Sequence, residues 1–162
     1  MNERAIRYSG CMSLMMVVAL GCSVGGEPSL ADFNDSNIKK LRGAYGLFLV
    51  AHNLNGPESK EELLAYLTTN PTAIRKMEMM GIAKDAIPSI FMSDRDGKPF
   101  KVRYGLKGLD DHYIVFESEG VDGKRLVAHH TPVELEPDEY EAAWAGQLKG
   151  VGAMGALGEV GQ

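Results

Sequence analysis

The sequence predicts an α+β fold, in which N-terminal helices pack on a small antiparallel sheet of three to four strands and a short C-terminal helix follows. Two patterns lead to this prediction. Apolar residues recur at helical spacing between Ile38 and Met80, and after Pro88 they alternate with polar residues at a period of two. Helices that come before the strands, rather than between them, favour α+β over alternating α/β.

The composition is that of an ordinary globular chain. Hydrophobic residues make up 44% and charged residues 24% of the 162 residues, which suits one packed domain and is unlike a disordered or fibrous sequence. The formal net charge is -5. Because nucleic-acid binding relies on clustered Lys and Arg, we expect no nucleic-acid partner. The chain has only 2 cysteines, so a disulfide-rich scaffold is excluded.

Residues 1–21 are interpreted as a signal peptide that is not part of the fold. Arg4 and Arg7 precede a short apolar run that begins at Met12 and ends at Leu20. A helix of that length spans only about 14 Å, which is too short to cross a bilayer but is typical of a signal peptide.

The run Val18-Ala19-Leu20-Gly21-Cys22 resembles the lipobox of bacterial lipoprotein signal peptides. The resemblance implies cleavage before Cys22, acyl chains such as palmitate on this cysteine, and a membrane partner bound through those chains. Ser23 stands where an aspartate would signal inner-membrane retention, so the resemblance favours the outer membrane. The alternatives are an ordinary secretory signal cut after Ala19 or Gly21, and an uncleaved anchor.

The rest of the chain divides into three parts. Residues 22–33 are expected to form the lipidated cysteine and a flexible tether, rich in Gly, Pro and Ser. Ten flexible residues have a reach of about 17–19 Å, which keeps the domain close to the membrane. Residues 34–148 hold a single α+β domain, and the glycine-rich residues 149–162 are expected to be a disordered tail.

Four helical segments are expected in the domain. The first follows N-cap candidates at residues 34–36 and runs for about 17 residues. Its apolar face consists of residues at helical spacing: Ile38, Leu41, Tyr45, Phe48, Leu49 and His52. A second helix begins at the capping box of Ser59 and ends near Leu67. A third begins at Pro71, and a last short helix begins at Pro137.

The strands are expected between the third and the last helix. Residues 89–92 form a first short strand, and residues 100–104 form a second strand with one water-facing side. Residues 113–116 are apolar on both faces, which is typical of a central strand. Residues 124–130 then return antiparallel to it.

Acidic turns separate these strands at residues 94–97 and 119–123. The first does not complete the ligand spacing of an EF-hand, so a polar β-turn is our interpretation. Weak calcium binding by Glu117, Glu119 and Asp122 is left open, because three carboxylates so close in sequence could share an ion.

No catalytic residue, cofactor site or metal site is predicted. The chain has no G-x-S-x-G elbow, no phosphate-binding glycine loop and no H-E-x-x-H motif. His129 and His130 are expected on opposite faces of a strand, where they cannot bind one ion. A pocket that joined His112 to Asp110 or Glu117 would favour an enzyme instead.

Three stretches carry a resemblance to known families: residues 93–100, 104–105 and 119–125. They resemble a group of short bacterial lipoproteins without known activity, which share a lipobox, a helix of the kind at residues 37–41 and a glycine-rich C-terminus. The Gly-x-Pro-aromatic part at residues 97–100 is also similar to the head domain of type II secretion major pseudopilins. In that family a helix leads through a loop into antiparallel hairpins.

The sequence therefore predicts a lipid-anchored protein of the bacterial cell envelope that acts as a structural or binding module without catalytic activity. Lys101 and Arg103 form a small basic stripe, which we expect to contact an acidic envelope partner or the lipid headgroups. The first alternative is an accessory pseudopilin-like subunit of a secretion or pilus-type machine. An uncharacterised envelope enzyme is the least favoured alternative.

Overall fold

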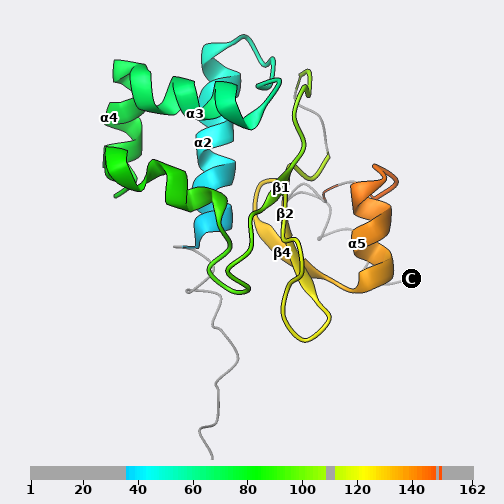
Figure 1. Cartoon of the computed structure of the whole chain (residues 1–162). Coiled ribbons are helices and arrows are strands. Elements are labelled where there is room, and N and C mark those ends of the chain that lie inside the picture. Colours follow the sequence, from blue (N-terminus) through cyan, green and yellow to red (C-terminus); the bar gives the residue numbers. More distant parts are fainter. Residues whose placement is uncertain (1–35, 109–111, 149, 151–162) are drawn as a thin grey trace, which may run out of the picture.

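The computed structural model describes residues 36–108, 112–148 and 150. The predicted signal peptide, Cys22 and the predicted tether lie outside these residues, and so does most of the predicted tail. In chain order the described elements are α2 (Asn37–Ala51), α3 (Lys60–Thr69), α4 (Pro71–Met79), the 3-10 helix η1 (Lys84–Phe91), β1 (Lys101–Val102), β2 (Val115–Phe116), β3 (Arg125–Ala128), β4 (Pro132–Leu135) and α5 (Pro137–Trp144) (Figure 1). None of the described helices is long and apolar enough to cross a membrane.

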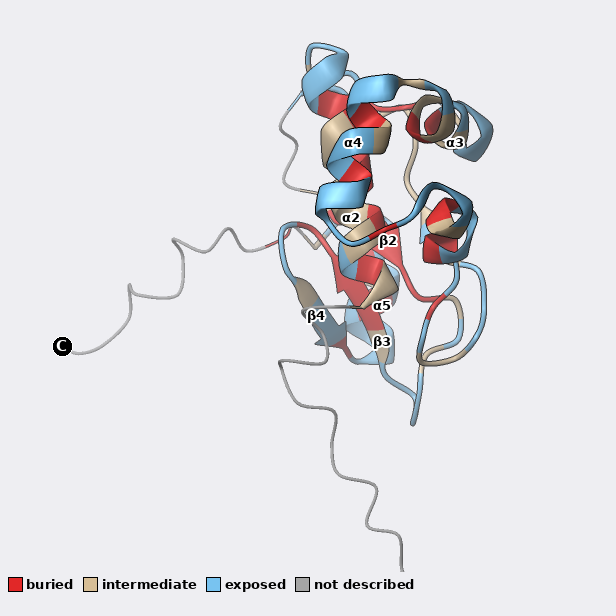
Figure 2. Cartoon of the chain, turned by 90° about the vertical axis from the view of Figure 1, so that its left-hand side faces the viewer, coloured by how far each residue is buried: buried red, intermediate tan, exposed pale blue. Residues whose placement is uncertain are grey.

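The predicted α+β class is confirmed. The described strands form one antiparallel sheet in the order β1-β2-β3-β4. The helices α2, α3, α4 and η1 lie on one side of this sheet, and α5 lies on the other (Figure 1). Val115 and Ala128 share an apolar cluster with α2, whereas Phe116 and Val127 share a second cluster with α5. Both faces of the sheet are therefore covered by helices, and Figure 2 shows the buried residues running through this interior.

The helix α2 follows the predicted apolar pattern. Its buried residues are Ile38, Leu41, Ala44, Tyr45, Phe48 and Leu49. The helix ends at Ala51, so His52 is its C-cap and is exposed. The ring of His52 stacks on Phe48, with ring centroids 3.8 Å apart. Phe48 lies in the same apolar cluster as Ile114 and the partly buried Val102, which agrees with the predicted packing of the N-terminal helices on the sheet.

The short helices α3 and α4 are confirmed with their caps. Ser59 accepts a hydrogen bond from the N–H of Glu62 at 3.2 Å, which begins α3. Asn70 ends α3 and caps α4 by accepting from the N–H groups of Thr72 and Ala73. Because each cap satisfies backbone donors that a helix start leaves open, these local signals fix both helix starts.

The strand predicted at residues 89–92 is wrong. These residues lie in and just after η1, which contains Pro88 and buries Ile87, Ile90 and Phe91. The spacing of the three buried side chains suits one face of a helical turn and not the alternation of a strand. Met92 alone makes an isolated bridge, to Pro99.

The strands are shorter than the sequence predicts. β2 lies inside the sheet, which confirms a central strand within residues 113–116. β1 covers only Lys101–Val102 of the predicted residues 100–104. The edge strand β4 was not predicted, because its segment Pro132–Leu135 begins with a proline and has no clear alternation.

Candidate functional site

A buried carboxylate, that of Glu117, lies directly after β2. The residue is 1% exposed. One carboxylate oxygen accepts a hydrogen bond from the hydroxyl of Ser93 at 2.8 Å, and the other accepts from the backbone N–H of Leu126 at 2.7 Å. The guanidinium of Arg95 lies 3.7 Å from the same carboxylate. Burial raises the pKa of Glu117, although the two hydrogen bonds and Arg95 oppose this effect.

The side chain of Glu117 takes the place of its own carbonyl in the sheet ladder. The N–H of Glu117 donates to the carbonyl of Leu126 at 2.8 Å, as in a regular antiparallel pair. The N–H of Leu126 donates in return to the Glu117 carboxylate, while the Glu117 carbonyl accepts from the hydroxyl of Tyr140 at 2.6 Å. This exchange ends β2 at Phe116 and ties α5 to the sheet.

Asp96 joins the loop before β1 to the turn between β2 and β3. One of its oxygens accepts from the N–H groups of Glu119 at 3.1 Å and Gly120 at 2.8 Å, and the other accepts from Lys98 at 2.9 Å. Burial alone would raise the pKa of Asp96, but these backbone hydrogen bonds outweigh it and lower the pKa. Gly120 has φ +75, and a Cβ there would lie 2.1 Å from the carbonyl oxygen of Lys124, so this turn requires glycine.

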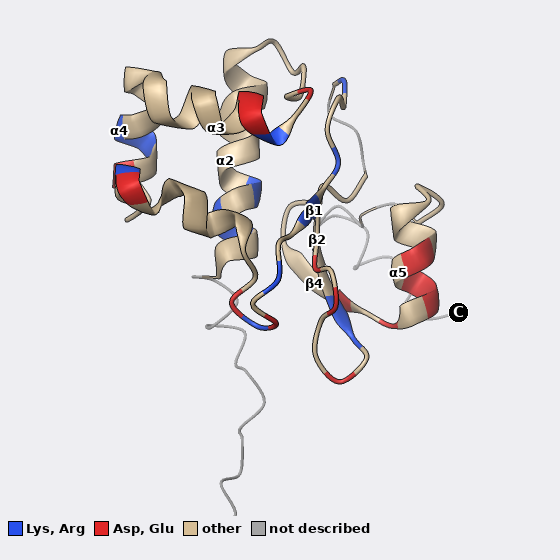
Figure 3. Ribbon diagram, viewed as in Figure 1, with Lys and Arg blue, Asp and Glu red and all other residues tan. Residues whose placement is uncertain are grey.

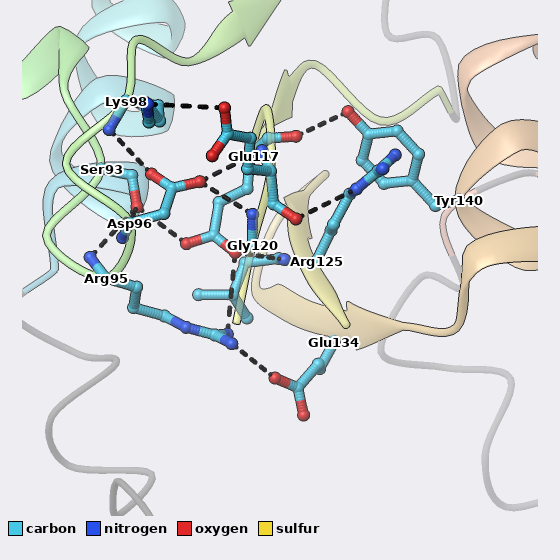
Figure 4. Close-up of polar contacts among 11 residues, drawn as sticks. Ser93, Arg95, Asp96, Lys98, Glu117, Gly120, Arg125, Glu134 and Tyr140 are labelled. Carbon is cyan, nitrogen blue, oxygen red and sulfur yellow. Dashed lines mark hydrogen bonds and ion pairs between the residues drawn. The ribbon is translucent and has the colours of Figure 1, made fainter. Parts of the chain in front are cut away.

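Ser93, Arg95, Asp96 and Glu117, which we call the Glu117 cluster, connect separate parts of the sheet region (Figure 4). Arg95 adds the contact with β4, because its guanidinium donates to Glu134 at 2.8 Å. The cluster therefore links the loop before β1, the turn after β2, the edge strand β4 and, through the Glu117 carbonyl, α5.

The Glu117 cluster places a hydroxyl beside a carboxylate, which are the types of group that a nucleophile and its base require. In this cluster, however, the hydroxyl of Ser93 donates to Glu117 and accepts from the N–H of Arg95 at 3.1 Å. Ser93 and Glu117 are 4% and 1% exposed. Both groups are therefore closed to solvent, and the contacts that the structure shows for the cluster join parts of the fold to one another.

Asp94, in the same turn, holds the start of α2. Its carboxylate accepts from the N–H of Asn37 at 2.6 Å, and the side-chain amide of Asn37 donates to the carbonyl of Met92 at 3.0 Å. A turn that we interpreted from sequence as a polar β-turn therefore also caps a helix that lies far from it in the sequence.

Lys101 and Arg103, the predicted partner-contact residues, lie on the side of the sheet that α5 covers. The guanidinium of Arg103 donates to the backbone carbonyls of Ala143, at 3.1 Å, and of Trp144. The cationic groups of Lys101 and Arg103 each lie 5.8 Å from the ring centroid of Trp144, which is 40% exposed. Arg103 therefore helps to hold α5 in place, and Lys101 remains exposed. The side of the strand at residues 100–104 that was predicted to face water is therefore partly covered by α5.

The two adjacent histidines differ from the prediction. β3 ends at Ala128, so His129 and His130 lie in a bend beyond the strand. Their ring centroids are 4.0 Å apart, and they do not point to opposite faces of a strand. His112 lies near the end of α5, since a Cβ added at Gly146 would be 3.6 Å from its ring. Asp110, its suggested partner, is outside the described residues.

The carboxylates considered for calcium do not converge. Glu117 is buried in its cluster, Glu119 pairs with Lys98 at 3.5 Å, and Asp122 is exposed in the turn. Within residues 36–108, 112–148 and 150, no three His, Cys, Asp or Glu side chains gather as a metal site requires.

Sequence reasoning missed the roles of Glu117, Asp96 and Tyr140. One signal was present: Glu117 follows four apolar residues that were predicted to be a central strand. A carboxylate at the end of such a strand is buried only where hydrogen-bond donors meet it. Comparison of the chain with protein-family models, with curated proteins and with solved structures gives no match.

Proposed function

We propose that this chain is a lipid-anchored protein of the bacterial cell envelope whose α+β domain acts as a structural or binding module and has no catalytic turnover. The observation that carries the proposal is the order of Arg4, Arg7, the short apolar run and Gly21-Cys22. Each feature has a role in export and acylation, and they occur at the spacing of a lipoprotein signal. Ser23 after the cysteine supports the outer membrane as the destination.

The geometry of the domain supports a role without turnover. The groups in the Glu117 cluster that resemble catalytic groups bond to one another and to the backbone. Arg103 similarly bonds to the end of α5. An apolar groove on the sheet face opposite α2 would favour a pseudopilin-like subunit. In this structure α5 covers that face. We therefore propose only the first function.

The test uses the two cysteines of the chain as a matched pair. Cys22→Ala should leave an unprocessed precursor or release the domain from membranes, because it removes the acyl acceptor. Cys11→Ala, in the predicted signal peptide, should leave processing and membrane attachment unchanged. Mass spectrometry of the purified protein should find acyl chains on Cys22. Normal cleavage and unchanged membrane retention in Cys22→Ala would contradict the proposal.

A further inference from the structure

The two halves of the described chain carry charge of opposite sign. Residues 36–92, the helical region, contain seven Lys or Arg and five Asp or Glu. The described residues from 93 to 148, the sheet region, contain seven Lys or Arg and ten Asp or Glu. Figure 3 shows basic residues on α2 and α4 and acidic residues along α5. An anionic surface would therefore meet less repulsion on the helical side.

Within the helical region, α4 presents a basic outer stripe. The residues Thr72, Arg75, Lys76 and Met79, which we call the α4 stripe, follow the spacing i, i+3, i+4 and i+7 and so share one side of the helix. Together with Pro71 they line a shallow, open hollow of about 440 Å³. Met79 is 79% exposed. Neither Arg75 nor Lys76 forms an ion pair with any residue that the structure describes.

The opposite side of α4 fixes the direction in which the stripe points. Ala73 and Met77 are fully buried in the apolar cluster with α2. Just beyond the helix, Met80 packs against α2, since a Cβ added at Gly43 would lie 2.8 Å from the Met80 methyl group. The α4 stripe is therefore held outward on a packed helix.

We propose that the α4 stripe rests on an anionic phospholipid surface, with Arg75 and Lys76 at the headgroup phosphates and Met79 in the interfacial layer. This inference rests on the proposed function, because the acyl anchor at Cys22 supplies the membrane. The 14 residue-to-residue steps from Cys22 to Ser36 span at most about 50 Å even when fully extended. α2, and α4 in the same apolar cluster, therefore stay within reach of the bilayer.

Arg75 and Lys76 together give only a modest attraction to an anionic membrane. A domain that is already anchored needs no stronger attraction to rest on that membrane. About 1 kcal/mol for each cation near an anionic surface corresponds to about a 30-fold gain in partitioning. For a free protein this gain is weak, but an anchored domain meets the surface at a high effective concentration. The α4 stripe lines a shallow hollow that is open to solvent, and with its exposed thioether it fits a headgroup layer better than a folded partner, which would need a deeper pocket for an anchor side chain.

The experiment separates this inference from acylation. The chain from residue 22 onward, with Cys22→Ser, retains every described residue but cannot be acylated through a thiol. We expect it to sediment with vesicles of phosphatidylcholine that contain about a third phosphatidylglycerol, and not with pure phosphatidylcholine. Raising the salt from about 0.05 M to about 0.5 M should release it, because salt screens the headgroup charge.

Two matched variants locate the surface. Arg75→Ala with Lys76→Ala should weaken binding about 30-fold. Lys107→Ala with Lys124→Ala makes the same change in net charge within the sheet region and should leave binding nearly unchanged. Glu78→Gln, which removes an exposed carboxylate one turn after Arg75, should strengthen binding to anionic vesicles. Circular dichroism should show the same fold in every variant.

Equal binding to neutral and anionic vesicles, or an equal loss in both double variants, would overturn the inference. Stronger binding to polyglutamate than to anionic vesicles would overturn it in favour of an acidic protein partner. The protein in this experiment carries no thioether-linked lipid. A failure to bind anionic vesicles would therefore leave the test of Cys22 acylation unaffected. Failure of acylation would likewise leave vesicle binding measurable.

Discussion

The helical region and the sheet region are held together in different ways. In the helical region α2 buries six apolar side chains against the shorter helices and the sheet. In the sheet region the strands are only 2 to 4 residues long, and the Glu117 cluster joins their loops by hydrogen bonds. Apolar burial therefore holds the helical region together, and in the sheet region a network of polar contacts adds to the apolar clusters on the two faces of the sheet.

The largest effect should come from the apolar core of the helical region. Phe48 is 2% exposed, stacks on His52 and meets Tyr66 edge-on with ring centroids 5.1 Å apart. We expect Phe48→Ala to lower the free energy of unfolding by about 3–5 kcal/mol, because it removes a buried ring and leaves a cavity. Urea unfolding followed by circular dichroism measures this change.

The matched control lies on the same helix. Val50 is 71% exposed, so Val50→Ala should change the free energy of unfolding by less than about 0.5 kcal/mol. The apolar clusters on the two faces of the sheet both contain residues of β2 and β3, so fluorescence of Trp144, the single tryptophan, should report the same midpoint as circular dichroism. A Phe48→Ala protein that is as stable as the wild type would show that this core contributes little.

A smaller effect is expected from the polar contacts of the sheet region. Glu117→Ala leaves the N–H of Leu126 and the hydroxyl of Ser93 without their buried acceptor. We expect a loss of about 3 kcal/mol, and about 1 kcal/mol for Glu117→Gln, which keeps one acceptor oxygen. Tyr140 donates to the backbone carbonyl of Glu117, which both substitutions keep, so urea unfolding followed by the fluorescence of Trp144 on α5 measures the loss.

The exposed pair of Glu119 and Lys98 provides the comparison for Glu117. Glu119→Ala should cost less than about 0.5 kcal/mol, because solvent screens this pair. A double-mutant cycle of Glu117→Ala with Ser93→Ala should give a coupling of about 1 kcal/mol or more. Equal effects of Glu117→Ala and Glu119→Ala would contradict the structural role of the Glu117 cluster.

The two regions also differ in how far the sequence predicts them. The helices were predicted from apolar spacing and from local start signals at Ser59 and Pro71, since both kinds of signal lie within a few residues of the element they specify. The error at residues 89–92 arose because a short apolar run fits either a strand or a helical turn. β4 was missed because an edge strand of 4 residues owes its form to pairing with β3.

The polar contacts could not be predicted, because they join residues far apart in the chain. Asp96 bonds to Gly120, and Asp94 caps α2 at Asn37. In sequence, both carboxylates are indistinguishable from those of a solvated turn. Arg103 was predicted on an open face, and only the placement of α5 shows that it bonds to the carbonyl of Ala143. Tertiary contacts of this kind carry no periodic signal.

The smallest effects should appear in the pH dependence of stability, where two members of the Glu117 cluster act in opposite directions. Burial raises the pKa of Glu117 above its ordinary value of 4.5, so the folded protein keeps a proton that the unfolded chain has lost. The stability contributed by Glu117 is therefore complete below pH 4.5 and falls as pH rises through the raised pKa. For Asp96, backbone hydrogen bonds outweigh burial and lower the pKa below its ordinary value of 3.8, so its contribution is present above that pH and is lost in acid.

Glu117→Gln should consequently flatten the decline of stability above pH 4.5, and Asp96→Asn should flatten the loss below pH 3.8. Urea unfolding of each variant, followed by the fluorescence of Trp144 between about pH 3 and about pH 7, measures both slopes. The two variants serve as controls for each other, because a general change in net charge would alter both slopes in the same direction. If both variants shifted the two slopes in the same direction, neither carboxylate would titrate within its hydrogen bonds, and the opposite signs assigned to Glu117 and Asp96 would be wrong.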